Sequence, residues 1–394
     1  MVNDKLKVEI IGSTKPGFVL SKKDALTFGA HEAGICYMGE TFEDIQNEDS
    51  SKTDFRKNLT LNNGHQSVYG HPSYNLLLTG IPKILAMILN NEKVYTTSEK
   101  SARYTKMNPT PKESELYAKW LPKFEKEIST KYPKIDSKKV TKLAQENARY
   151  LTSVFTPTTM GYTTDFRQLN YLMHWFDDFI HHKADTPFNK RLKVSMHQFN
   201  SQLKKFYVEE LDPNAKSRYL SMFKTRLPDH PVFDVVYSVN YEGSFAHLAQ
   251  AHRHRTINYQ IKISSVAACP DEFFVPPILE HPVLKKSDLA DEWYDDINSV
   301  AELFPQGTML MINERGTVED FVSKAYERLC GHAQLEIQNQ TKKTLDLYLA
   351  NTEGKVPEIH EILKPLANGP RCTFPSYDCT SACNFGKKAL ERLI

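Results

Sequence analysis

The sequence has few cysteines, little net charge and no long apolar run. Its 394 residues include six cysteines, too few and too scattered for the disulfide framework of a secreted domain. Lysine and arginine number 50 against 48 aspartates and glutamates, so no global positive field exists to recruit a nucleic-acid polymer. The most apolar stretch, residues 74–89, contains Pro82 and Lys83 and is too short to cross a bilayer. Because the N-terminus enters a strand-like run without a signal-peptide core, we expect a cytoplasmic protein without a membrane partner.

The order of predicted elements restarts near the middle of the chain. His71-Pro72 precedes a strand over 74–78 and a helix over 82–90, and His230-Pro231 precedes a strand over 235–239 and a helix over 244–251. The length also exceeds that of a usual single domain. We therefore predict an internal duplication, with a first repeat over residues 1–220 and a second repeat over 221–394.

Local patterns predict the remaining elements. Residues 8–12 are typical of a strand, and a helix is expected from Ser21, its cap, to Tyr37. Residues 40–58 are polar and poorly periodic, which predicts a loop. Apolar residues at helical spacing predict further helices over 117–132, 137–155, 169–181, 192–211, 284–303, 318–329 and 333–349.

The triplet Arg253-His254-Arg255 is the sharpest local feature of the sequence. Two guanidiniums around an imidazole at a helix end concentrate donors for phosphate oxygens. Gln250 lies one helical turn earlier, so Gln250 and Arg253 can face the same ligand. An isolated triplet of this kind is also typical of a solvated basic turn.

Three weaker groups accompany the triplet. Ser101 and Arg103 alternate after Glu99, and in an extended segment they point to the same side. The turn Gly64-His65-Gln66-Ser67 precedes a strand, a place where loops often line sites. The segment 328–340 repeats polar residues at helical spacing, which is usually the solvated face of a helix.

These pieces resemble the flavin-dependent thymidylate synthases, whose signature has the form R-H-R-x-x-S-x-N-x-x-S-x-R. The first repeat keeps the upstream turn at 64–71 and the end of the signature at Glu99, Ser101 and Arg103, with Asn91-Glu92-Lys93 in place of R-H-R. Arg149 is similar to a nucleotide-binding arginine of the family, and Asp165-Phe166-Arg167 resembles its N-A-R segment.

The second repeat keeps the other share of the signature. It has Gln250 and the Arg-His-Arg triplet, and its segment 328–338 resembles the family's downstream S-H-A-Q-W-E-I-Q helix. Ile263 and Ser265 stand in place of the later serine and arginine, and Ala301 in place of the nucleotide arginine. In the family each site forms at an interface of a homotetramer. The resemblance therefore implies fused repeats that each supply half a site, in a homodimer that forms a pseudo-tetramer.

The resemblance implies an α/β (α+β) fold with two similar repeats, each an antiparallel sheet packed with helices. It also implies reductive methylation of dUMP to dTMP with bound FAD, using methylenetetrahydrofolate and NADPH. The implied nucleotide set comprises Glu99, Ser101, Arg103, Arg149, Gln250, Arg253 and Arg328, of which Ser101, Arg103, Arg253 and Arg328 are the expected catalytic residues. The implied flavin set comprises His65, Gln66, Ser67, Asp165, Arg167, His254, Arg255, His332 and Gln334.

Departures from the family pattern leave alternatives open. Asp165 stands where asparagine is usual, and Ser98 and Gln260 do the same in the signature. They indicate a different pyrimidine product, such as a hydroxymethylated one, or a descendant that binds nucleotide and flavin without catalysis.

Three cysteines crowd the C-terminal region at Cys372, Cys379 and Cys383. They are a candidate zinc site if His360 or Cys330 supplies a fourth ligand, although the spacing is not that of a zinc ribbon. An iron–sulfur site and three reduced structural thiols are the other interpretations.

Overall fold

A computed structural model describes residues 5–15, 17–101, 109–211, 220–223, 227–263, 270–281 and 283–394. The described residues form a mixed α/β fold with two four-stranded antiparallel sheets. The chain divides into two compact units, the first made of residues 1–100 and 157–221 and the second of 101–156 and 222–394. Within the described ranges, no helix combines the length and the apolar character that crossing a membrane requires.

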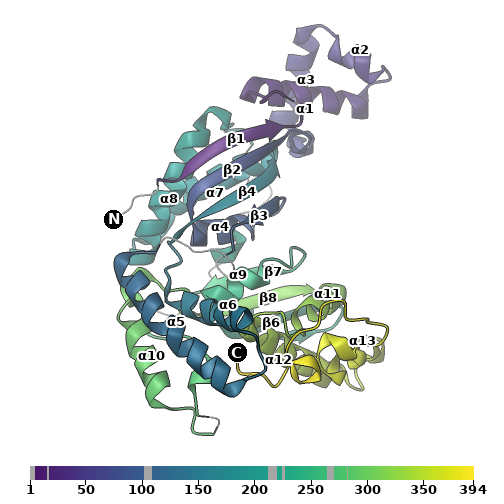
Figure 1. The fold of residues 1–394 in the computed structure, drawn as a ribbon. Helices are drawn as coiled ribbons and strands as arrows, with labels where there is room; N and C mark the ends of the chain where they lie inside the picture. The colour runs from purple at the N-terminus through teal and green to yellow at the C-terminus, as the bar shows by residue number, and fades with distance from the viewer. Residues whose placement is uncertain are drawn as a thin grey trace. The chain divides into compact units, whose positions relative to one another are not determined.

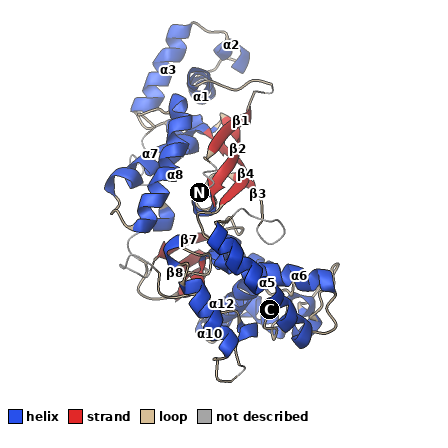
Figure 2. Ribbon diagram, turned by 60° about the vertical axis from the view of Figure 1, so that its left-hand side comes forward, coloured by secondary structure: helices blue, strands red, loops and turns tan. Residues whose placement is uncertain are grey.

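The first unit is built on a sheet with the strand order β1-β2-β4-β3 (Figure 1). Its strands are β1 Lys7–Ser13, β2 Ser73–Pro82, β3 Thr96–Glu99 and β4 Pro157–Asp165. Side chains alternate along β2 and β4, so that one face of each strand is buried, as expected for a half-covered antiparallel sheet. Figure 2 shows α7 (Phe166–His182) and α8 (Pro187–Leu203) along one side of these strands. The short helix α4 (Lys83–Leu89) also packs on the sheet, and every residue in it is buried.

Three further helices of the first unit lie before β2. They are α1 Lys22–Tyr37, α2 Phe42–Gln46 and α3 Ser50–Asn62. The predicted cap at Ser21 is confirmed, because Ser21 and Asp24 form a capping box. The predicted loop over 40–58 is wrong, since α2 and most of α3 occupy it. These helices bury few apolar side chains, so their periodicity is weak, and the usable signal was the capping box of Thr41 and Asp44.

The second unit contains a sheet with the strand order β5-β6-β8-β7. Its strands are β5 Val232–Phe233, β6 Val236–Ser244, β7 Asn258–Lys262 and β8 Met309–Thr317. Its helices are α5 Pro111–Lys131, α6 Ser137–Ala148, α9 Phe245–Ala251, α10 Asp288–Asn298, α11 Val318–Arg328, α12 Leu335–Thr352 and α13 Pro357–Leu363.

Helices α5, α6 and α10 form a helical layer of the second unit with its own apolar core, and Figure 1 shows α5 lying beside α10. The rings of Trp120 and Trp293 meet edge to face at 5.0 Å, and Trp120 Nε1 donates to Asp296 at 2.7 Å. Both α5 and α10 come from the connection between the third and fourth strands of their sheets. Residues 101–156 of the predicted first repeat therefore lie in the second unit, so the compact units do not follow the predicted division at 220/221 throughout.

Several predicted helices differ from the observed ones at their C-terminal ends. The helix expected over 137–155 stops at Ala148, where a 3₁₀ turn over Arg149–Leu151 begins. The helix expected over 284–303 is α10, which ends at Asn298 before a 3₁₀ turn over Ala301–Leu303. In both places apolar residues continue beyond the helix, because the turn is also buried, so periodicity alone does not locate the end.

The two sheets correspond where their fourth strands lead into a helix. In the first, Ser73 pairs with Asp165, the N-cap of α7; in the second, Val236 pairs with Thr317, the N-cap of α11. The prediction of two antiparallel sheets packed with helices is confirmed. The duplication from which we derived it stays a prediction, and the shared strand order is consistent with it.

Candidate functional site

A buried cluster in the second unit joins α9, the turn after it and the end of α11. Arg328 Nε donates to His254 Nε2 at 2.7 Å, and its Nη2 donates to the Gln250 carbonyl at 3.3 Å. Arg328, His254 and Gln250 are all less than a tenth exposed. Arg253 and Arg255, on either side of His254, are exposed. The triplet therefore presents two guanidiniums outward and one imidazole inward.

His254 is held in its neutral form. Burial, together with the charges of Arg328 and Lys324, lowers the pKa of His254 to about 2. A guanidinium has only donors, so His254 Nε2 must be the acceptor in its bond with Arg328, and the ring proton lies on Nδ1. The imidazole thus orients the Arg328 side chain without adding charge.

Glu336, near the start of α12, connects three segments of the second unit. Its carboxylate accepts hydrogen bonds from the backbone N–H of Ser244 at 2.7 Å and from the Ser244 hydroxyl at 2.6 Å. It also accepts from the Tyr150 hydroxyl at 2.9 Å. Burial raises the pKa of Glu336, whereas these hydrogen bonds and the charge of Arg149 oppose the rise. Since Ser244 is the N-cap of α9, Glu336 fixes the beginning of the helix that carries Gln250.

Arg149 reaches this cluster from the 3₁₀ turn that follows α6. It is 4% exposed, and the neighbouring Tyr150 ring packs on Phe274 with centroids 4.7 Å apart. Gln334 Nε2 donates to the Tyr150 hydroxyl. Burial raises the pKa of Tyr150 well above its ordinary value, and the Glu336 carboxylate adds to the rise. The predicted first repeat therefore supplies Arg149 and Tyr150 to a cluster otherwise built from the second.

Two amide oxygens in this cluster lack donors. Gln250 Oε1 and Gln334 Oε1 are buried and have no hydrogen-bond partner among the described residues. The two side chains are 3% and 2% exposed. A buried acceptor without a donor costs about 1–3 kcal/mol, which a ligand N–H in the right place would recover.

The predicted solvated helix face over 328–340 is wrong. α11 ends at Arg328 and α12 begins at Leu335, so His332 lies in the loop between them. Gln334, Glu336 and Gln338 are all buried. Polar residues at helical spacing here serve a buried hydrogen-bond network, which periodicity cannot distinguish from a solvated face.

A second buried network, missed by sequence reasoning, lies between the sheet and α11. Glu314 and Lys324 are both fully buried and form an ion pair at 2.5 Å. The hydroxyls of Tyr237 and Tyr241 donate to the two Glu314 oxygens at 2.6 and 2.7 Å. His247 Nε2 lies 3.1 Å from the Tyr241 hydroxyl, and burial lowers the pKa of His247 well below its usual value. Lys324 lies one helical turn before Arg328, so this network supports the same end of α11.

The flavin set in the first unit centres on the turn at 64–70. Gly64 has φ of 76°, a conformation that favours glycine, and it leads into a 3₁₀ turn over Gln66–Gly70. His65 Nδ1 lies 3.0 Å from the Tyr37 hydroxyl, and His65 and Ser67 are exposed.

Gln66 and Arg167 meet through a third residue. Arg167 Nε donates to the Tyr171 hydroxyl at 2.7 Å, and that hydroxyl lies 3.4 Å from Gln66 Oε1. Arg167 Nη2 is buried without a hydrogen-bond partner in the part of the chain that the structure describes. Asp165 caps α7 by accepting from the Gln168 N–H at 2.6 Å. Tyr37 and Tyr171 were not predicted, and only their aromatic character near the turn offered a signal.

The other first-repeat residues of the nucleotide set are Glu99, Ser101 and Arg103. Glu99, at the end of β3, pairs with Lys83 at 2.5 Å. Ser101 is partly buried, and Arg103 lies outside the described residues. At the position equivalent to the Arg-His-Arg triplet, Glu92 is buried and accepts from the Ser221 N–H at 2.8 Å. This place in the first unit is therefore a structural contact.

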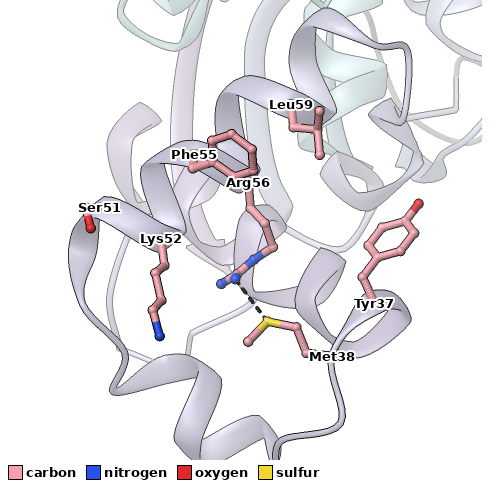
Figure 3. Close-up of a pocket in the computed structure, with 7 residues that line it drawn as sticks. All are labelled: Tyr37, Met38, Ser51, Lys52, Phe55, Arg56 and Leu59. Carbon is pink, nitrogen blue, oxygen red and sulfur yellow. Dashed lines mark hydrogen bonds between the residues drawn. The ribbon is translucent and has the colours of Figure 1, made fainter.

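A pocket of about 490 Å³ opens between the end of α1 and α3 in the first unit (Figure 3). Arg56 donates to Met38 Sδ at 3.0 Å and pairs with the buried Glu48. Tyr37, at the pocket, also contacts His65. The pocket is lined by Tyr37, Met38, Ser51, Lys52, Phe55, Arg56 and Leu59. Its lining combines aromatic and aliphatic side chains with the cations of Lys52 and Arg56.

The C-terminal cysteines are free thiols. Among the described residues, no group of three or more His, Cys, Asp or Glu side chains is placed to hold a metal ion. His332 Nε2 instead lies 3.1 Å from the Ser381 carbonyl, a contact that holds the C-terminal segment.

Residues 19–186 match the family described as thymidylate synthase complementing protein. The matched segment, which is less than half of the chain, is similar to that family. The segment includes the turn at 64–70, Glu99, Arg149 and Arg167. Gln250, Arg253 and Arg328 lie beyond it, where the likeness to the family rests on their motifs.

Two solved structures illustrate the likeness. PolB from Streptomyces cacaoi, a UMP/dUMP methylase bound with 5-Br dUMP, is 17% identical with a TM-score of 0.32, over 52% of this chain and 92% of its own. Thymidylate Synthase X from Helicobacter pylori, solved with FAD and dUMP, is 14% identical with a TM-score of 0.31, over 53% of this chain and 100% of its own. No curated protein matches the chain.

Proposed function

We propose that this thymidylate synthase complementing protein relative binds FAD and dUMP and transfers a one-carbon unit to C5 of the pyrimidine, as reductive methylation to dTMP. The observation that carries the proposal is a series of contacts in the second unit. Glu336, which feels the charge of Arg149, accepts from the N-cap of α9, and the Gln250 carbonyl on that helix accepts from Arg328. Arg149 comes from the matched segment, and Gln250 and Arg328 come from the motifs beyond it. Similarity to the family over residues 19–186 supports the reaction class, and these residues offer the groups that a nucleotide needs.

The cluster suits a uracil nucleotide. Uracil presents two carbonyl oxygens and one N–H, and the second unit supplies guanidinium donors at Arg149 and Arg328 and buried amide acceptors without donors at Gln250 and Gln334. The exposed Arg253 is available for the phosphate. Guanidiniums fixed before reaction stabilise negative charge as it develops on the pyrimidine oxygens, which activates the ring.

The first unit fits a flavin at the turn over 64–70. The buried Arg167 Nη2 needs an acceptor, and the exposed His65 and Ser67 lie on the same turn as Gln66. FAD, when bound, would supply the hydride, with carbon from methylenetetrahydrofolate and electrons from NADPH. The task of Arg167 is to orient an acceptor group, and the bond from its Nε to the Tyr171 hydroxyl holds the guanidinium in place.

Nucleotide titration tests the nucleotide assignment. dUMP should bind more tightly than UMP in isothermal titration calorimetry. Arg149→Gln and Arg328→Gln should each weaken dUMP binding about 10- to 100-fold, because each removes a charge-assisted contact of about 1.5–3 kcal/mol. Lys342→Gln, on the exposed side of α12, is the matched control and should change nothing. Equal affinity for all pyrimidine nucleotides would contradict the proposal.

Division of the site between the repeats has its own test. Arg103→Ala and Arg253→Ala should each abolish dUMP binding if each repeat supplies half of one site. Light scattering should show a homodimer, and mixing the two mutant chains should restore some sites if each site draws its halves from different chains. If Arg103→Ala binds dUMP normally while Arg253→Ala does not, the first repeat contributes nothing to the nucleotide site.

A second candidate is a descendant that binds nucleotide and flavin without methylating, or that makes a hydroxymethylated product. It is favoured by Asp165, whose carboxylate lies near the proposed flavin turn where the family has a neutral asparagine. Purified protein should be yellow, with absorbance near roughly 450 nm that NADPH bleaches. Bleaching followed by a dTMP product supports the main proposal; a bound flavin that NADPH never reduces supports the binding protein.

A further inference from the structure

Four of the six cysteines line one cavity in the second unit. The cavity has a volume of about 230 Å³ and lies between the loop after α11 and the C-terminal segment. Its cysteines are Cys330, Cys372, Cys379 and Cys383, all free thiols. Neither the nucleotide set nor the flavin set uses them.

Two of these thiols approach the same short stretch of backbone. A β-carbon built on Gly331 would lie 2.5 Å from Cys383 Sγ, so the Cys383 thiol packs against the residue next to Cys330. Arg371 Nη2 donates to Cys330 Sγ at 3.6 Å, and its guanidinium lies 4.6 Å from the centre of the Tyr377 ring. Arg371 Nε is buried without a hydrogen-bond partner in the described part of the chain. This guanidinium is placed to stabilise negative charge on the Cys330 sulfur.

The C-terminal segment is fastened to the same loop by non-covalent contacts. The Arg371 N–H donates to the Leu329 carbonyl at 2.5 Å, and His332 contacts Ser381. Arg392 Nε donates to Gln338 Oε1 at 2.9 Å and its Nη2 to the Ala333 carbonyl at 2.5 Å. The loop over 329–334 joins Arg328 to Gln334, so a bond formed in this cavity would fix the loop on which both residues depend.

We propose that Cys330 and Cys383 are a redox modification site, forming a disulfide when a peroxide reaches the cavity. Cys330 thiolate attacks one oxygen of hydrogen peroxide, which gives a sulfenic acid and hydroxide. Cys383 then attacks that sulfur, the sulfur–sulfur bond forms, and the sulfenic oxygen leaves as water. In sum two thiols and one peroxide give one disulfide and two waters. The product ties the C-terminal segment covalently to the loop between α11 and α12.

Thiol counting on the full chain tests this site. The fully reduced protein, treated with one equivalent of hydrogen peroxide, should lose two thiols per chain in a DTNB assay. Peptide mapping without reductant should recover the Cys330 peptide linked to the Cys383 peptide. Cys330→Ser and Cys383→Ser should each abolish that linked peptide, and Cys36→Ser, at an exposed thiol of the first unit, should behave as wild type. In the oxidised chain, amide exchange over 329–334 should be slower than in the reduced chain.

Three outcomes would overturn the proposal. The first is a linkage that joins Cys372 or Cys379 instead. The second is a bond between chains, seen as a dimer on a non-reducing gel. The third is stoichiometric zinc in the purified protein that is lost in Cys330→Ser, which would make the cavity a metal site. Mapping is done on the wild-type chain, so a variant that fails to fold does not leave the result open.

Discussion

The two sheets share one strand order, but α7 and α11, the helices that follow their fourth strands, bury different kinds of side chain. Counting seven and eleven residues from the N-cap reaches Leu172 and Phe176 on α7, but Lys324 and Arg328 on α11. The strand position three residues before the cap is Tyr162 in the first unit and Glu314 in the second. All of these side chains are buried. One topology therefore tolerates either an apolar or an ionic interface, and the ionic one lies in the unit that holds the proposed nucleotide residues.

The ionic interface of the second unit is not explained by its contribution to stability. An apolar interface stabilises through burial alone, whereas a buried ion pair is costly to desolvate and contributes little net stability. Retaining Glu314 and Lys324 in the second unit is hard to justify by stability, and it is consistent with a need to orient Arg328.

The largest effect is expected from breaking the buried pair. Lys324→Leu gives α11 the residue found on α7, but leaves Glu314 charged and buried without its ammonium partner. The free energy of unfolding should fall by about 3–5 kcal/mol in urea denaturation. The double variant Lys324→Leu with Glu314→Gln should recover much of the loss. Leu172→Met in the first unit is the matched control, expected to cost less than about 1.5 kcal/mol. A double variant no better than the single one would show that charge imbalance is not the cause.

Removing the charge of Glu336 should have a smaller effect. Glu336→Gln keeps the shape but presents an NH₂ group to donors at Ser244 or Tyr150, so one buried contact is lost. We expect a loss of about 1.5–3 kcal/mol of stability and weaker dUMP binding, because α9 and the Arg149 turn both depend on this residue. Glu361→Gln, at an exposed position of α13, should alter neither property. If Glu336→Gln binds dUMP as tightly as the wild type, Glu336 does not support the nucleotide site.

The pH dependence of stability should also differ between the units. The pKa of His254 is about 2 in the folded chain and near 6.5 when unfolded, so between these values only the unfolded chain takes up the proton. Stability should therefore fall as pH drops below 6.5, by about 1.4 kcal/mol per pH unit for this histidine. His247, whose pKa is also lowered, adds to the slope. Thermal unfolding of His254→Asn across pH 4–7 should show a shallower slope than wild type, and equal slopes would contradict the burial of a neutral ring.

The smallest effect is expected at the two N-caps. Asp165→Asn restores the family residue and should change stability by less than about 0.5 kcal/mol, because asparagine and aspartate cap equally well. Flavin affinity should rise if the carboxylate opposes the phosphates of FAD. Thr317→Asn at the equivalent cap of the second unit should leave flavin binding unchanged. Flavin titration followed by fluorescence quenching distinguishes the two.

The fold was predicted from the repeated order of strands and helices, and the site was predicted from motifs. Each kind of prediction had a physical limit. Apolar runs that end at turn residues and the cap at Ser21 are local signals, and they located β1, β2 and the start of α1. The start of α7 was missed, because Asp165 was not recognised as its cap. The Glu314–Lys324 pair could not be predicted, because one strand residue and one helix residue become neighbours only through sheet register. Arg149 was predicted as a nucleotide residue by resemblance, but its position beside Glu336 depends on where α5 and α6 pack, which their amphipathic pattern leaves open.

The packing of α5 and α6 in the second unit also constrains how this gene can change. The polypeptide passes between units at 100/101, 156/157 and 221/222, so no single cut yields two intact halves. A fragment beginning at residue 222 would expose Trp293 and Ile297, which now face Trp120 and Phe124 in the shared core. If two genes were once joined here, the packing of α5 and α6 in the second unit now hinders their separation.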